Sequence, residues 1–238
     1  MNGRPAYYAP TGTTVGDMAA ILHVPYTLWH LSYVAMGAGL AENLDWTVLA
    51  GTVLAFFCGT GIAAHAFDEL HSRPLRTSLS DRSLRLLGAS GFVAAALVAV
   101  AGAFLLDIWV LAWAAAGIIL AGGYAVEQPR LLHTPLGFAL AWGAFPAVVG
   151  YWAQALRLDW TVLALSAFAT LTSLAQRSLS TSARNVRRTV DHVEVNLRRG
   201  TNNEVWDAAR LLRTWETALR LLAWSMPVLA LALLARHH

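Results

Sequence analysis

The chain has 238 residues, of which 57% are hydrophobic and only 13% are charged, and its formal net charge at pH 7 is +3. About a quarter of the residues of an average soluble domain are charged, so this composition excludes an ordinary soluble domain. A single cysteine, Cys58, excludes an intramolecular disulfide and a cysteine-based zinc site.

Seven stretches of the chain have the length and character of membrane spans. The apolar core of a bilayer is about 30 Å thick and takes roughly 20 apolar residues per helix. The apolar runs are continuous rather than alternating, which predicts helices. We therefore expect an all-α polytopic membrane bundle of about seven transmembrane helices, near residues 18–40, 46–66, 86–105, 108–126, 134–154, 159–176 and 217–235.

Arginines are distributed asymmetrically between the loops that join these stretches. They gather after the second stretch, after Gln128-Pro129 and between residues 177 and 213, and the loops on the opposite side hold only Arg157 and Arg236. Arginine-rich loops stay in the cytoplasm. We expect the plasma (inner) membrane of a prokaryote, with the N-terminus cytoplasmic and the C-terminus on the opposite side.

The predicted spans and the polar segments beside them divide the chain into four parts. Residues 1–17 read as a cytoplasmic leader and residues 18–180 as a six-span bundle. Residues 181–216 read as a cytoplasmic arginine-rich loop that becomes an amphipathic surface helix from about Asn202. Residues 217–238 form the last span and the C-terminus.

The densest group of chemistry-bearing residues lies at the cytoplasmic end of the second stretch. His65 precedes Asp68 by three residues and Glu69 by four, so all three share one face of a helix. Carboxylate and imidazole groups together bind divalent cations. Arg73 and Arg76 follow at once, and guanidinium groups suit phosphate. Ionisable residues at a membrane helix end indicate function, although a solvated, charged helix end stopped by proline is the plainer alternative.

An early helix that ends in an acidic motif followed by Arg73-Pro74 resembles the UbiA superfamily of intramembrane prenyltransferases. Two further segments are similar to that family: Tyr124 to Arg130 after the fourth stretch, and the glycine-containing fifth stretch from Gly137 to Gly150. The sequence also departs from the family, because only Asp68 of the first aspartate-rich motif is present and the second motif reads Arg177-Ser178 without carboxylates.

The resemblance implies an enzyme that acts on an isoprenyl diphosphate or a related lipid phosphate, most simply by prenyl transfer. Its partners would be the bilayer and the lipid or isoprenoid substrate; no nucleic acid is expected, and a protein partner stays open. The implied cofactor is a divalent metal, with Mg²⁺ favoured. The implied catalytic residues are Asp68, Glu69, Tyr124 and Glu127, and the phosphate-binding residues are Arg73, Arg76, Arg130 and Arg177.

Two alternatives remain open at this point. Histidines together with carboxylates suit iron, manganese, zinc or copper better than magnesium, so a UbiA-like scaffold converted to another metal chemistry is the first. The second is a non-catalytic membrane subunit that binds lipid, because a fold does not fix a function. The metal ligands would be His65, Asp68 and Glu69, with His30, Glu127 and His133 as further candidates.

Overall fold

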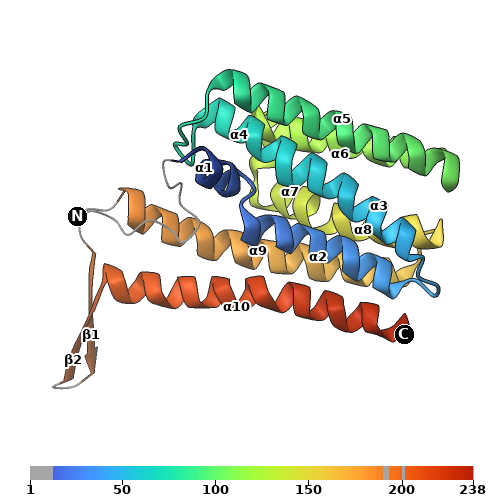
Figure 1. Cartoon of the computed structure of the whole chain (residues 1–238). Coiled ribbons are helices and arrows are strands. Elements are labelled where there is room, and N and C mark those ends of the chain that lie inside the picture. Colours follow the sequence, from blue (N-terminus) through green and yellow to red (C-terminus); the bar gives the residue numbers. More distant parts are fainter. Residues whose placement is uncertain (1–12, 190–192, 200–201, 238) are drawn as a thin grey trace.

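The computed structural model describes residues 13–189, 193–199 and 202–237. Long, roughly antiparallel helices form a bundle, and a two-stranded hairpin projects from one of its ends (Figure 1). The short helix α1 lies at that same end, whereas the C-terminal end of α10 lies at the other (Figure 1). The bounds of the elements are α1 Thr14–Ile21, α2 Val24–Leu40, α3 Trp46–Phe56, η1 Phe57–Ala64, α4 His65–Ser72, α5 Asp81–Leu105, α6 Trp109–Ala125, η2 Arg130–His133, α7 Pro135–Ala139, η3 Leu140–Ala144, α8 Phe145–Ala155, α9 Trp160–Thr189, β1 Glu194–Arg199, β2 Asn202–Asp207, α10 Ala208–Leu234 and η4 Ala235–His237.

The predicted apolar stretches are largely helical, so the all-α bundle is confirmed. The first stretch, 18–40, is not one helix, because the left-handed backbone of His23 separates α1 from α2. Within the described residues, four helices are long and apolar enough to cross a membrane, which indicates a membrane protein. The helix Trp109–Ala125 is apolar but shorter. The four long ones are Trp46–Ser72, Asp81–Leu105, Pro135–Ala155 and Ala208–His237.

The segment after the sixth stretch differs from the prediction. Helix α9 continues to Thr189 instead of ending near residue 176, because no proline or glycine interrupts it. The predicted surface helix from Asn202 is also wrong: this residue begins β2, which pairs with β1 in an antiparallel hairpin. Helix α10 begins at Ala208, where the Asp207 carboxylate caps it by accepting a hydrogen bond from the Arg210 N–H at 2.8 Å.

The centre of the bundle is the crossing of α2 and α8. The structure leaves no room for a side chain there: a Cβ on Gly37 would lie 2.2 Å from the Ala147 carbonyl oxygen, and one on Gly150 would lie 2.1 Å from that of Val34. Small residues of this kind let helix backbones approach closely in membranes. The aromatic side chains of Trp29 and Tyr33 fill the core beside the crossing.

Two of the long helices contain a π-helical segment. Helices α3 and α4 are joined without a break through η1, and α7 and α8 are joined through η3. One extra residue in such a turn shifts the helix register and changes carbonyl pairing, which is why π-segments are frequent at functional sites. Here they position His65, directly after η1, and Trp142, inside η3.

Candidate functional site

Polar and aromatic side chains converge inside the bundle toward the end that carries α1. They come from elements that are far apart in the sequence, and α2, α4, α6, η2, η3 and α9 each contribute at least one. The members are His23, Tyr26, His30, His65, Asp68, Tyr124, His133, Trp142, Gln176 and Arg177.

Two of the histidines are held by carbonyl groups of the π-segments. Nδ1 of His30 lies 2.6 Å from the Trp142 carbonyl oxygen, and Nδ1 of His65 lies 3.2 Å from that of Gly61. Because a carbonyl only accepts, each Nδ1 carries the proton, and Nε2 of each ring is the basic nitrogen. Both imidazoles therefore have a defined orientation and tautomer.

His23 joins these two histidines. Its backbone has a φ of 44° at the junction of α1 and α2, a left-handed conformation that is uncommon for a residue with a side chain. Its ring lies 4.7 Å from that of Tyr26 and 5.7 Å from that of His65, measured between centroids. Strained backbone of this kind gathers at functional sites.

Three side chains of α9 form hydrogen bonds with tyrosines of neighbouring helices. The Tyr33 hydroxyl lies 2.6 Å from Oγ1 of Thr172, the amide of Gln176 donates to the Tyr26 hydroxyl, and Arg177 donates to the Tyr124 hydroxyl at 3.3 Å. These bonds tie α9 to α2 and α6. The polar stripe of α9 therefore runs along the interior toward the end that carries α1.

Arg177 is fixed on several sides. Beside its bond to Tyr124 it donates to the His133 carbonyl at 2.8 Å, and its guanidinium lies 4.7 Å from the centre of the Phe138 ring. The rings of Tyr124 and His133 stack at 4.2 Å. In the described structure, Nδ1 of His133 and Nε1 of Trp142 are buried without a hydrogen-bond partner, which is costly unless a ligand or water reaches them.

Asp68 lies at the mouth of this group. It is half-buried, and it interacts electrostatically with Glu127, His71 and Arg184. Glu127 is exposed and also has a left-handed backbone, with a φ of 56°. The structure thus brings three of the predicted catalytic residues, Asp68, Tyr124 and Glu127, to one region.

Glu69 has a different position from its predicted partners. Its side chain is fully buried, and its carboxylate accepts hydrogen bonds from the Leu75 N–H at 2.9 Å, the Thr77 N–H at 2.8 Å and the Thr77 hydroxyl at 3.0 Å. Both oxygens hold the loop after α4. We conclude that Glu69 is a structural residue and not the catalytic and metal-binding residue that its spacing predicted, because spacing alone does not show where a side chain points.

Replacing Glu69 by glutamine is therefore expected to destabilise the protein, because an amide group would face a backbone N–H in place of an oxygen. The expected cost is about 1–3 kcal/mol. Thermal unfolding in detergent measures it, beside Glu42→Gln, which removes an exposed ion pair with Arg157 and should change little. A Glu69→Gln protein with wild-type stability but no activity would return Glu69 to the site.

The same loop also engages Arg73 and Asp17. Arg73 donates to the Leu79 carbonyl at 2.7 Å and pairs with Asp81, so its guanidinium is used locally. Asp17, fully buried, accepts from the Ser78 N–H at 2.7 Å. Arg76 and Arg130 are exposed on the surface. Of the four predicted phosphate-binding arginines, only Arg177 lies inside the group.

The predicted metal ligands do not come together. Among the described residues, no group of three or more His, Cys, Asp or Glu side chains could hold a metal ion. Glu69 has both oxygens bound to the loop, which removes one of the three carboxylates among the predicted ligands. His30 lies in α2 against the Trp142 carbonyl, whereas His133 lies in η2 and stacks on Tyr124. These residues do not fit the divalent-metal site that the spacing predicted.

An apolar cavity of about 260 Å³ lies between α3, α5, α6 and α8. Its lining contains no charged residue. The aromatic rings of Trp113, Phe145 and Trp152 line one part, and the glycines Gly51, Gly59 and Gly117 leave space open. Trp142 also lines the cavity, and its ring lies 5.5 Å from that of His30 and 5.2 Å from that of Tyr124. The cavity therefore adjoins the polar group through one side chain.

The sequence did not single out Trp142 or Gln176 as site residues. Gln176 has a usable signal, because an amide inside an apolar stretch needs a partner. Trp142 has none, since one more tryptophan in an apolar helix is unremarkable. Compared with known proteins, the chain matches no family model, no curated protein and no solved structure.

Proposed function

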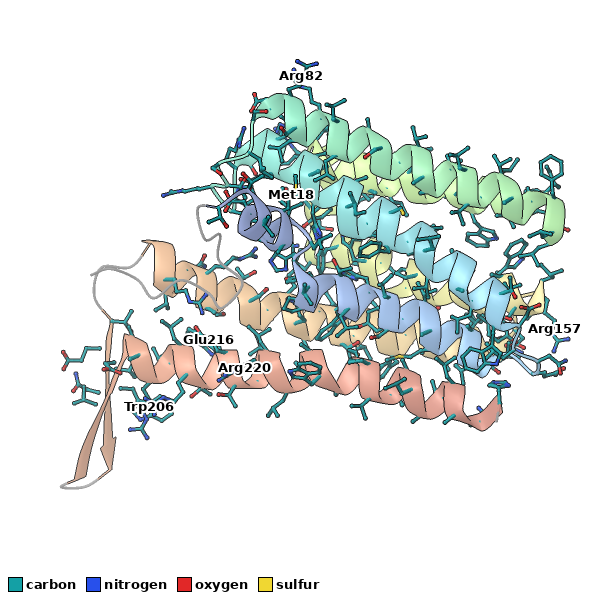
Figure 2. The ribbon with its side chains drawn as sticks, viewed as in Figure 1. Met18, Arg82, Arg157, Trp206, Glu216 and Arg220 are labelled. Carbon is teal, nitrogen blue, oxygen red and sulfur yellow. The ribbon has the colours of Figure 1, made fainter. Side chains whose placement is uncertain are left out.

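We propose that seven helices cross the membrane: α2, α3–α4, α5, α6, α7–α8, α9 and α10. The end of the bundle that carries α1 lies in the cytoplasm of a prokaryote. Arg82 lies at that end, whereas Arg157 lies at the other (Figure 2). On α5 the exposed side chains change from Arg85 to Leu86, and on α10 from Arg220 to Leu221. The apolar part of α5 that follows, up to Leu105, is about 30 Å long, the thickness of a bilayer core.

We propose further that this protein is a UbiA-like intramembrane enzyme that acts on an isoprenyl diphosphate or a related lipid phosphate. The observation that carries the proposal is the apolar cavity beside the polar group, joined through Trp142. A long hydrocarbon chain suits a cavity lined by apolar side chains, and a phosphate head suits a region with Arg177. Both parts of one amphipathic substrate are thereby accommodated.

The reaction would be prenyl transfer. The allylic C–O bond breaks, the diphosphate leaves with the electron pair, and a nucleophilic atom of the acceptor bonds to the allylic carbon. Arg177 would stabilise the charge on the leaving group. The ring faces of Tyr124 and Trp142 would stabilise the allylic cation. Asp68 would take the proton that the acceptor releases. No step is assigned to a metal, because the residues do not fit a metal site.

The proposal is tested by measuring diphosphate release from radiolabelled geranylgeranyl diphosphate by the purified protein in lipid nanodiscs, with a lipid extract as the source of acceptor. We expect turnover by the wild type and a loss of roughly 100-fold in Asp68→Asn, the low end for removing an acid–base group. Glu42→Gln, at the far end, should retain full activity. No release by the wild type, with tight lipid binding retained, would instead identify the lipid-binding subunit.

A further inference from the structure

All charged residues of helix α9 are positive. Between Trp160 and Thr189 it contains no aspartate or glutamate, and its four charged residues are the arginines at 177, 184, 187 and 188. All four lie in the C-terminal part of α9, near the end of the bundle that carries α1. A helix of this kind attracts anions, and phosphate groups above all.

Arg184 continues the polar stripe of α9 beyond Arg177. The two residues are seven apart, so they lie on one face of the helix and about 10 Å from each other along its axis. Arg184 is exposed, and its guanidinium donates to the neighbouring Thr181 hydroxyl at 3.3 Å. It also interacts electrostatically with Asp68 and His23, which places it beside the mouth of the polar group.

Two other arginines near this end are held in ion pairs. Arg187 pairs with Glu216 of α10, and Glu216 lies beside Arg220 on that helix (Figure 2). Arg73 pairs with Asp81 and holds its own loop. Arg177 and Arg184 share one face of α9, and neither forms an ion pair in the described structure.

Resting on the proposed function, we propose that Arg177 and Arg184 bind the diphosphate group directly, without a metal ion between protein and phosphate. Arg177 holds the inner end of the anion and Arg184 the end at the mouth. Two guanidinium groups, of which that of Arg177 is fixed by its neighbours, can donate several hydrogen bonds to phosphate oxygens. Asp68 repels the anion, so binding depends on Arg184 to offset that carboxylate.

The test is equilibrium binding of radiolabelled inorganic diphosphate, and separately of geranylgeranyl diphosphate, in nanodiscs of uncharged lipid with EDTA present. We expect both to bind the wild type. Arg184→Gln should weaken both by roughly tenfold or more, the usual loss for a hydrogen bond to a charged group. Arg184→Lys should restore part of the affinity. The controls are Arg82→Gln and Arg187→Gln, which should bind as the wild type does.

Arg184 is exposed, so its variant should fold even where Arg177→Gln does not. Unchanged diphosphate binding in Arg184→Gln would overturn the inference, as would binding that EDTA abolishes or that nanodiscs of phosphatidylglycerol suppress completely. Arg184-dependent diphosphate binding without any prenyl transfer would support this inference and refute the proposed reaction. Prenyl transfer that is insensitive to substitution of both arginines would support the proposed reaction and refute this inference.

Discussion

Replacing Gly150 by alanine is expected to prevent the bundle from folding. The added Cβ would lie 2.1 Å from the carbonyl oxygen of Val34 and 2.8 Å from its carbonyl carbon, and both are backbone atoms that cannot rotate away. Helices α2 and α8 would have to separate, with loss of packing around Tyr33 and Met36. We expect a cost of at least about 3 kcal/mol, the upper part of the range for overpacking.

The measurement is the yield of monodisperse protein and its thermal unfolding in detergent. Gly37→Ala should behave like Gly150→Ala, because its Cβ would lie 2.2 Å from the Ala147 carbonyl oxygen. Gly122→Ala is the matched control: nothing lies within 4 Å of its Cβ, and alanine favours helix by about 0.5–1 kcal/mol. A Gly150→Ala protein as stable as the Gly122 variant would show that α2 and α8 are not in close contact.

Filling the apolar cavity is expected to remove binding of the isoprenoid while leaving the protein folded. Gly51 has nothing within 4 Å of a Cβ, and Gly59 has only the Ala95 methyl at 3.8 Å, so leucine at either position would extend into the cavity. Excluding part of the hydrocarbon chain forfeits burial worth roughly 2–3 kcal/mol, or about 30- to 150-fold in affinity.

Comparing the dissociation constants of geranylgeranyl diphosphate and inorganic diphosphate separates binding of the hydrocarbon chain from binding of the diphosphate group. Gly51→Leu and Gly59→Leu should weaken the first and leave the second unchanged, since the polar group lies beyond Trp142. Gly122→Leu, on a helix of the same bundle but outside the cavity, should alter neither. Equal weakening of both ligands would mean that the variants disturb the fold, and no weakening would assign the chain to another site.

Local sequence patterns were enough to predict most of the helices. Continuous apolar runs predicted all seven long helices, because in lipid a backbone satisfies its hydrogen bonds only within the helix. The end of α4 before Pro74 also follows from the sequence, since the residue before a proline disfavours the helical conformation. The length of α9 and the β1–β2 hairpin do not follow from the apolar pattern, because the polar residues after an apolar run can continue a helix or form a strand.

The site shows where local patterns stop being sufficient. The grouping of His65, Asp68 and Glu69 on one helix face followed from spacing, but their surroundings did not: Glu69 turns to a loop, whereas Asp68 interacts electrostatically with Glu127 and Arg184. Those interactions join α4 to residues about 60 and 115 positions later, and only the packing of the whole bundle sets them.

By itself the sequence determined the apolar helices, their order and the side of the bundle where arginine gathers, because each of these depends on residues close together in the chain. Only the tertiary structure decided that Trp142 joins an apolar cavity to the polar group, and that Arg73 is engaged in its own loop while Arg184 interacts electrostatically with Asp68. A π-turn and a glycine crossing shift whole helices relative to one another, and no local pattern records such shifts.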